Sequence, residues 1–336
     1  MPHASASREK SACAVKHPER SAPAKRESDM PEDKKITVIV MQGPTGVGKT
    51  GAALELADLF SMEIINADSM QVYRGMDIGT SKPDTAQQAL VPHHLFSVAE
   101  PDEEFNAADY LRQGRTAIKA IAARERVPLI VGGTGLYVQA LLHGLSSAPE
   151  GDRQIRLQLQ QQDPAKLYER LREVDPQAAA KIKPQDTLRI IRALEVFITT
   201  GTPLSAHHAA HQFRPAPYNA LRLCLNRDRP ELYRRINQRV DQMFADGIVQ
   251  EVSELRKRGI AETEKPMQAI GYRHVVNYLN GACSLDETLR CMQKDTRHFA
   301  KRQITWLKRI PEARWINLPR EQDLVARSVK KALNKG

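Results

Sequence analysis

The chain has 336 residues, 41% of them hydrophobic, which allows one large or two modest globular domains with a sizeable core. A net charge of +10 points to a polyanionic partner, although many basic proteins bind no nucleic acid. The four cysteines are scattered without C-x-x-C spacing, which argues against a zinc ribbon or a disulfide framework. No apolar run reaches the roughly 18 residues of a membrane span, so we expect no membrane segment and a cytoplasmic location.

The first 34 residues differ in composition from the rest of the chain. They are rich in Ser, Ala, Pro and charged residues and contain no apolar stretch of the kind that a secretory signal needs. This composition predicts a disordered basic tail over residues 1–34. Met30, directly before the first apolar run, is an alternative start of translation.

A phosphate-binding motif follows the first predicted strand, residues 36–41. The string GPTGVGKT matches G-x-x-x-x-G-K-[ST] and opens a predicted helix. Glycines there let backbone N–H groups turn toward an oxyanion, and the helix N-terminus adds positive potential. Lys49 would reach the terminal phosphates and Thr50 a Mg²⁺ ion. The alternative is a chance match in an ordinary strand–turn–helix. The predicted phosphate-binding residues are Gly43, Pro44, Thr45, Gly46, Val47, Gly48, Lys49 and Thr50.

Further strands are predicted at residues 62–68 and 127–131, with a helix over 107–124 between them. Strands that alternate with helices predict a parallel sheet, whose ligands gather at the carboxyl ends of the strands. Asp68 and Thr134, each at such an end, should therefore converge with the phosphate-binding loop. A carboxylate there either holds Mg²⁺ through water, takes a proton as a general base, or caps the following turn. The threonine either donates a hydrogen bond to a phosphate or belongs to a plain turn.

Helix signals replace strands from about residue 148 to 217, which predicts a helical insertion in the α/β core, itself residues 35–147 and 218–320. A strand is predicted at 221–225, and the remainder as helical, beginning with an amphipathic helix from Glu231. Within the insertion, one helix that ends at Gly201 is predicted to bury Leu188, Ile191, Leu194 and Ile198.

Basic residues recur at helical spacing in two places. Arg189 and Arg192 lie three apart on the insertion helix, and a second set follows near the C-terminus: Arg297, Lys301, Arg302, Lys308 and Arg309, interleaved with Phe299, Ile304, Trp306 and Leu307. Each set alone is either a solvated face or a phosphate-binding surface; two sets and the net charge favour a nucleic acid. In the string QAIGYR, Tyr272 and Arg273 are suited to stacking on an unpaired base.

Together these motifs resemble the tRNA dimethylallyltransferase family. The resemblance covers residues 35–315, and because the chain has no C-terminal zinc finger it is similar to the bacterial type. The strings that carry it are GPTGVGKT from Gly43, DSMQVYRGMDIGTSKP from Asp68, PHHL from Pro92, PLIVGGTGLY from Pro128, RALEVF from Arg192, AIGYR from Ala269 and AKRQITWLKR from Ala300.

The resemblance implies an α/β fold with a P-loop NTPase-like core and a helical insertion that grips the anticodon stem-loop of tRNA. It implies transfer of a dimethylallyl group from dimethylallyl diphosphate to the exocyclic amine of the adenosine 3′ to the anticodon, with Mg²⁺ present and diphosphate released. Asp68 would be the general base, Thr134 and Lys49 would assist catalysis, and Arg235 would join the P-loop on the diphosphate. The tRNA-binding residues implied are Asp68, Ser69, Met70, Gln71, Gly135, Leu188, Arg189, Ile190, Ile191, Arg192, Gln268, Ala269, Ile270, Gly271, Tyr272 and Arg273. We expect a monomer.

Three other functions use the same loop. A small-molecule or nucleoside kinase would transfer a phosphoryl group from ATP, with Asp68 as base for a hydroxyl. An adenylate isopentenyltransferase would prenylate a free nucleotide. A nucleic-acid-binding switch ATPase would hydrolyse ATP without covalent transfer. The basic helices and the matched strings favour the tRNA enzyme.

Overall fold

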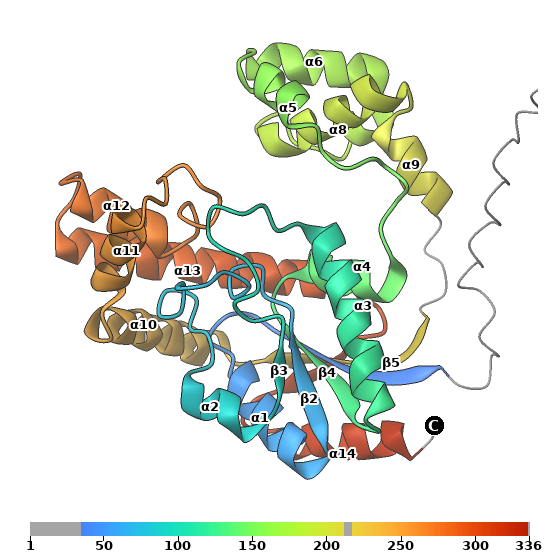
Figure 1. Ribbon diagram of the computed structural model, residues 1–336, viewed down its shortest axis with the longest axis vertical. Helices are drawn as coiled ribbons and strands as arrows, with labels where there is room; N and C mark the ends of the chain where they lie inside the picture. Colours follow the sequence, from blue (N-terminus) through green and yellow to red (C-terminus); the bar gives the residue numbers. More distant parts are fainter. Residues whose placement is uncertain (1–34, 212–216, 335–336) are drawn as a thin grey trace, which may run out of the picture. The chain divides into compact units, whose positions relative to one another are not determined.

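A computed structural model describes residues 35–211 and 217–334, so the predicted tail at 1–34 lies outside the described residues. In this part of the chain six parallel strands form one sheet (Figure 1), and the hydrogen-bonded pairs give the order β3–β2–β4–β1–β5–β6. The strands are β1 Ile36–Gln42, β2 Met62–Asn66, β3 His93–His94, β4 Val127–Gly132, β5 Tyr218–Asn226 and β6 Arg314–Asn317. The predicted parallel sheet is confirmed.

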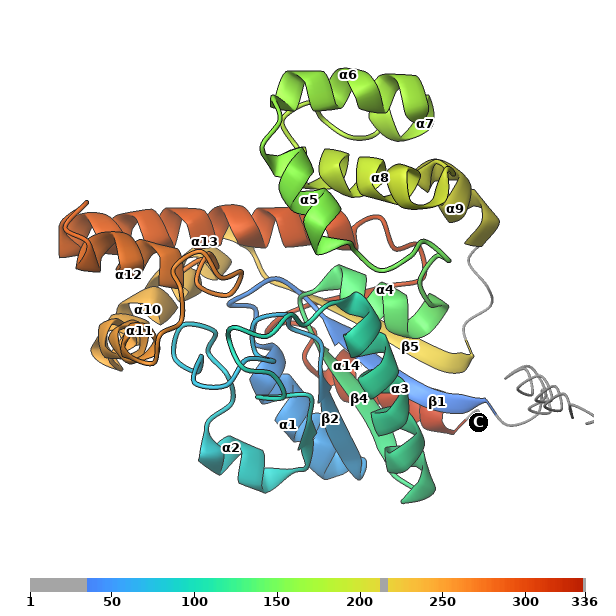
Figure 2. The same cartoon turned by 45° about the horizontal axis from the view of Figure 1, so that its top comes forward.

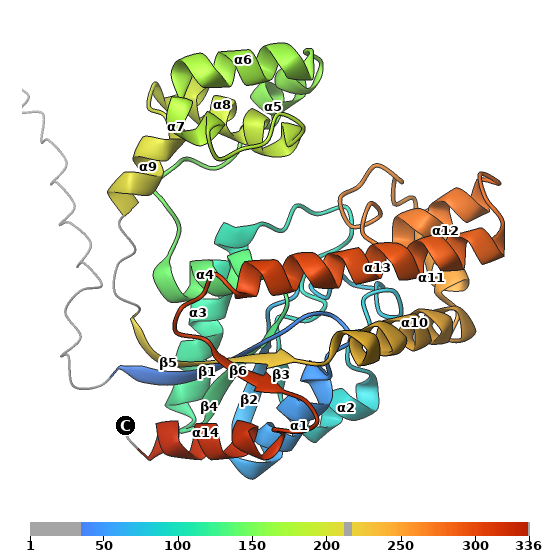
Figure 3. The same cartoon turned by 180° about the vertical axis from the view of Figure 1, so that it is seen from behind.

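Both faces of the sheet are apolar, as a parallel sheet covered by helices requires. Along β1, Val38 and Val40 belong to one core cluster, whereas Ile39 and Met41 belong to the other, because successive side chains point to opposite faces. The first face is covered by α3 (Ala107–Ala123) and α4 (Gly135–His143). The second face is covered by α1 (Lys49–Leu59) and α14 (Asp323–Leu333), as Figures 2 and 3 show.

The end of the chain departs from the prediction that everything after residue 225 is helical. Residues Arg314–Asn317 form β6, which pairs with β5 at the edge of the sheet. Helix α14 then packs Val325 and Val329 against the sheet. The core therefore extends beyond residue 320, its predicted end. A four-residue strand is too short to show a periodicity, and only its pairing with β5 identifies it.

Four helices on the C-terminal side of the sheet complete the core. They are α10 (Arg229–Ala245), α11 (Ile248–Lys257), α12 (Tyr272–Leu279) and α13 (Leu285–Leu307), and α13 lies against both α10 and α12. Helix α10 buries Ile236, Val240 and Met243, which confirms the predicted amphipathic helix. The short helix α2 (Thr85–Leu90) follows the loop after β2.

The segment predicted as an insertion is helical where the structure describes it and encloses an apolar cluster of its own around Leu171, Ile190 and Leu194. The face predicted for α8 is partly wrong, because Leu188 and Ile198 are 76% and 40% exposed. The buried face centres on Leu194, and at 3.6 residues per turn Leu188 points about 120° away from it. The helices are α5 Arg153–Gln160, α6 Pro164–Val174, α7 Pro176–Ala179, α8 Thr187–Thr200 and α9 Leu204–His211.

Among the described residues, no helix is both long enough and apolar enough to cross a membrane.

Candidate active site

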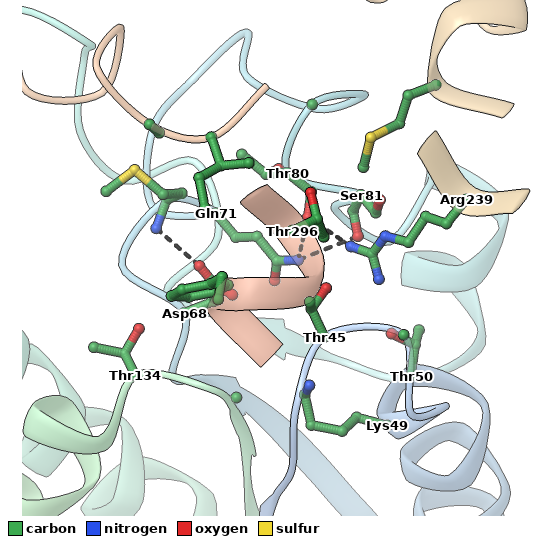
Figure 4. A pocket seen from close by; sticks show the side chains of 18 of the residues that line it. Thr45, Lys49, Thr50, Asp68, Gln71, Thr80, Ser81, Thr134, Arg239 and Thr296 are labelled. Atoms are coloured by element: carbon green, nitrogen blue, oxygen red, sulfur yellow. Dashed lines mark hydrogen bonds between the residues drawn. The ribbon is translucent and has the colours of Figure 1, made fainter. Parts of the chain in front are cut away.

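A cavity of about 730 Å³ opens at the carboxyl ends of β1, β2 and β4 (Figure 4). Asp68 and Thr134 lie on one side of it and Arg239 on the other, with Thr45 and Lys49 between them. Most of the predicted site residues line this cavity: Thr45, Gly46, Gly48, Lys49, Thr50, Asp68, Ser69, Met70, Gln71, Thr134, Arg235, Gln268, Ala269, Ile270, Tyr272 and Arg273. Gly43, Pro44, Val47 and Gly271 belong to the same loops behind its surface, whereas Gly135 and Leu188 to Arg192 are not part of its lining.

The P-loop has the backbone that its glycines allow. Gly46 and Gly48 have φ values of 78° and 107°, in the left-handed region that other residues avoid. A Cβ on Gly43 would lie 2.8 Å from the carbonyl oxygen of Leu225, so β5 packs directly against the loop. Lys49 Nζ donates hydrogen bonds of 3.0 Å to the carbonyl oxygens of both Gly43 and Pro44. The loop thus holds its lysine over the place where a phosphate would sit.

The charge of Lys49 is weakened by its surroundings. Burial in the cavity wall and the nearby Arg239 lower its pKa to about 8, while Asp68 opposes this. Desolvation disfavours the ammonium form, and an anion bound in the cavity would favour it. The site is therefore electrostatically prepared for a negatively charged ligand.

Asp68 is fixed by the residue two positions before it. The side chain of Asn66, fully buried at the end of β2, accepts a hydrogen bond from Asp68 N at 2.8 Å and donates to the carbonyl oxygens of Asp68 and Leu95. Asp68 Oδ1 accepts from Met70 N at 3.0 Å, so the turn-capping role left open by the sequence is present. The carboxylate still lines the cavity, so the cap holds it in place for chemistry.

Thr134 connects the ends of β4 and β2. Its hydroxyl oxygen accepts a hydrogen bond from Ser69 N at 2.9 Å and lies 3.3 Å from the Ser69 hydroxyl. In this arrangement Thr134 orients the segment that carries Asp68. This positioning function is one that the spacing of GGTG did not predict.

Arg235 lies at the P-loop, where Nε donates to the carbonyl oxygen of Gly46 at 2.9 Å. One helical turn later, Arg239 donates to the carbonyl oxygen of Thr80 at 3.2 Å. Burial lowers the pKa of Arg239, Asp68 raises it, and Arg235 lowers it further. Arg239 is not among the residues predicted for the site, although its i, i+4 spacing from Arg235 places it on the same face of α10.

Gln303 is a second residue that the sequence did not reveal. It lies on α13, and its side chain accepts a hydrogen bond from Thr45 N at 2.9 Å and donates to the carbonyl oxygen of Gly133 at 3.3 Å. One amide thus joins α13 to the P-loop and to the turn after β4.

Tyr272 does not have the exposed ring that we predicted for base stacking. Its side chain is fully buried, and its hydroxyl donates to Glu251 on α11 at 2.6 Å. The same carboxylate accepts from the backbone N–H groups of Asp77, Ile78 and Gly79. The ring therefore supports the loop after β2, and the neighbouring Arg273 forms an ion pair with Asp295.

The insertion helix also differs from the prediction. Ile190 and Ile191 are buried in the α5–α9 cluster, so their side chains are not available to RNA. Arg192 binds the buried Glu195 at 2.7 Å and the carbonyl oxygen of Pro149, which argues against a direct phosphate contact. Arg189 is 74% exposed and pairs only with the neighbouring Asp186 in the contacts described.

Comparisons with known proteins agree on one family. The family model described as IPP transferase matches residues 71–310, and one described as isopentenyl transferase matches 36–91. A tRNA dimethylallyltransferase of Geobacter sulfurreducens is 47% identical over 87% of this chain and 95% of its own. One of Desulfosudis oleivorans is 48% identical over 89% of this chain and 96% of its own.

Solved structures agree with these relatives. A tRNA isopentenylpyrophosphate transferase of Bacillus halodurans is similar with a TM-score of 0.68 and 36% identity, over 90% of this chain and 98% of its own. A eukaryotic dimethylallyltransferase described as acting on tRNA is similar with a TM-score of 0.73 and 29% identity, over 84% and 74%. The P-loop NTPase-like fold predicted from the sequence is confirmed, and the kinase, free-nucleotide and switch-ATPase alternatives lose their support. The chain belongs to the tRNA dimethylallyltransferase family and is a prenyl-transferring enzyme that acts on tRNA.

Proposed function

We propose that this enzyme transfers the dimethylallyl group of dimethylallyl diphosphate to the exocyclic amine of the adenosine 3′ to the anticodon. The observation that carries the proposal is one cavity whose wall holds both a phosphate-binding loop and a carboxylate fixed by Asn66. The relatives' names, which specify dimethylallyl transfer and tRNA, support the choice of donor and acceptor.

The chemistry follows from where the charges lie. The adenine amine is a weak nucleophile, because its lone pair is delocalised into the ring. As the new C–N bond forms and the C–O bond of the donor breaks, Asp68 takes a proton from the amine. Lys49, Arg235, Arg239 and the loop N–H groups would neutralise the charge that grows on the departing diphosphate.

Thr50 is our candidate for the protein's contribution to a Mg²⁺ site. It lines the cavity beside Lys49. Magnesium commonly keeps several waters and is held mainly by substrate phosphates, so one hydroxyl from the chain fits this ion. When bound, Mg²⁺ would neutralise negative charge on the diphosphate.

For contacts with the tRNA we propose the cavity residues Asp68 to Gln71, Gln268 to Ile270 and Arg273. Gly135 beside the cavity and the exposed Arg189 on the α5–α9 segment complete this proposal. Residues 148–217 would then form a separate domain that grips the tRNA. We propose that the enzyme acts as a monomer in the cytoplasm.

The test supplies unmodified tRNA and Mg²⁺ with donor labelled in the isoprenoid, or with ATP labelled in the γ-phosphate. We expect isoprenoid label in tRNA without ATP, and none with Asp68→Asn, because the amide cannot accept the proton. The variant should bind the anticodon stem-loop within about threefold of the wild type. Phosphoryl transfer without prenylation would overturn the proposal, and equal loss of binding would remove Asp68 as the base.

A further inference from the structure

The burial of Tyr272 leaves open which aromatic ring could receive an unpaired base. The other aromatic side chains of the cavity wall are His93, Phe96 and Phe299. His93 and Phe96 contact each other edge to face, with ring centroids 5.3 Å apart. Phe299 on α13 is 37% exposed and lines the cavity.

The position of Phe299 on α13 keeps its ring out of the core. Ala300, the next residue, is 0% exposed and belongs to the core, whereas Phe299 points about 100° away from it around the helix. The ring of Phe299 is partly buried and still leaves 37% of the residue's surface exposed where it lines the cavity. A partly exposed aromatic side chain in the wall of a functional cavity is available to contact a ligand there.

A cation accompanies the ring. The guanidinium carbon of Arg302, three residues later on α13, lies 5.7 Å from the centroid of the Phe299 ring. Arg302 lines the cavity too, whereas Arg297 is engaged with Asn237 at 2.6 Å. An aromatic ring beside an arginine is a combination that binds single-stranded nucleic acids, because the ring stacks on the base and the cation attracts the backbone.

We propose that Phe299 is a stacking platform for the unpaired base next to the target adenosine, with Arg302 beside it. This rests on the proposed target: when the adenosine enters the cavity to bring its amine to Asp68, its neighbour loses a stacking partner. Unpaired loop bases commonly regain that stacking on aromatic side chains. The platform thus lowers the cost of taking the adenosine out of the loop.

The test uses the full enzyme and an anticodon stem-loop RNA with 2-aminopurine at one or the other position flanking the target. Removal of the target from the loop relieves the quenching of its neighbour, and stacking on Phe299 restores it. We therefore expect dimmer RNA complexes with the wild type and Phe299→Tyr than with Phe299→Leu. Phe299→Leu keeps an apolar side chain but has no ring, and should lose the quenching. A base–aromatic stack is worth roughly 1–3 kcal/mol, so its Kd for the RNA should rise about 5- to 150-fold.

Two controls separate stacking from other roles. Pyrophosphate binding by Phe299→Leu should match the wild type, and the salt dependence of its RNA binding should keep the wild-type slope, since no charge is removed. Arg302→Gln should make that slope shallower. Wild-type RNA affinity and quenching in Phe299→Leu would overturn the platform while leaving prenyl transfer intact. Failure of prenyl transfer in the wild type would overturn the proposed function, and the quenching would still report on stacking.

Discussion

Lys49 has a pKa of about 8 because the cavity wall desolvates it and Arg239 lies nearby. A bound diphosphate favours the ammonium form and raises this pKa, so binding requires a proton once the pH exceeds about 8. We expect the affinity for inorganic pyrophosphate to be steady below pH 7.5 and to fall by up to about tenfold per pH unit above 8. Titration calorimetry between pH 6.5 and 9.5 measures this.

The matched control is Lys49→Arg, whose guanidinium stays charged over this range. Its pH profile reports the titration of pyrophosphate itself. Any steeper loss of pyrophosphate affinity with pH in the wild type is then caused by deprotonation of Lys49. Identical slopes in the two proteins would show that protonation of Lys49 does not limit binding.

At the scale of elements, α8 carries two arginines that sequence spacing treats as equivalent and the structure does not. Removal of Arg192 leaves Glu195, 1% exposed, with only Arg156 at 3.3 Å among its ion pairs described here, and should cost about 1–3 kcal/mol because Arg192 is itself partly exposed. Arg189→Ala removes an exposed charge and should change stability by less than about 0.5 kcal/mol. Urea unfolding of the two alanine variants measures the contrast.

For RNA binding we expect the opposite contrast, with a larger effect of replacing Arg189 than of replacing Arg192. Arg189→Ala, measured at several salt concentrations, should weaken tRNA binding and make its salt dependence shallower by about one charge. Arg192→Gln is the gentler comparison, because the amide can still donate to Glu195. An unchanged slope in Arg189→Ala would remove α8 from the tRNA interface.

Strand β2 carries a buried carboxylate whose ionisation supports the edge of the sheet. Glu63, 2% exposed, accepts hydrogen bonds from Arg124 and His94, and Arg124 is the main cause that lowers its pKa to about 2. A lowered carboxyl pKa gives stability that is present above the unfolded value near 4.5 and is lost as the pH falls toward 2. The lowering corresponds to about 3 kcal/mol.

We therefore expect Glu63→Gln to be less stable than the wild type at pH 7, with the gap closing as the pH falls from 4.5 to 2.5. Urea titrations at pH 7, 4 and 3 on both proteins measure this, and catalytic activity is not needed as a readout. A gap that stays constant with pH would mean that packing, and not charge, is what the substitution removes.

At the scale of the whole molecule, Gln303 connects parts of the chain 258 residues apart. Because α13 also carries Phe299 and Arg302 at the cavity, we expect this amide to couple the P-loop to the proposed RNA-binding side. Binding of pyrophosphate should therefore change the Kd for the stem-loop, and the RNA should change that for pyrophosphate by the same factor. Gln303→Leu should bring this factor toward one, whereas Gln303→Glu keeps the bond to Thr45 and should retain part of it.

Two titrations, each with and without the other ligand, measure this factor in each protein. The wild type and Gln303→Leu should first be shown to unfold at similar urea concentrations. If pyrophosphate and RNA change each other's Kd by the same factor in Gln303→Leu as in the wild type, then Gln303 does not carry the coupling.

The sequence was most informative where local chemistry decides the structure. GPTGVGKT, Asp68 and Thr134 lie at the ends of long apolar strands, and their convergence in one cavity follows from a parallel sheet. The sequence was least informative where the burial of a side chain decides its role. Tyr272 looks like a stacking residue in QAIGYR, and only the position of Glu251 shows that its ring is inside. Likewise β6 exists because β5 offers an edge, which no pattern within residues 314–317 encodes.

The contact between Gly79 and Tyr272 has a consequence for how this enzyme can evolve. A Cβ at position 79 would lie 2.6 Å from two ring carbons of Tyr272, a fully buried side chain that would have to shift. Substitutions at positions 79 and 272 are therefore expected to depend on each other. We expect a lineage that acquires alanine at 79 to have replaced the ring at 272 as well, and with it the hydroxyl that donates a hydrogen bond to Glu251. In related sequences we expect a larger residue at 79 to occur only together with a smaller one at 272, as a compensated pair inherited jointly.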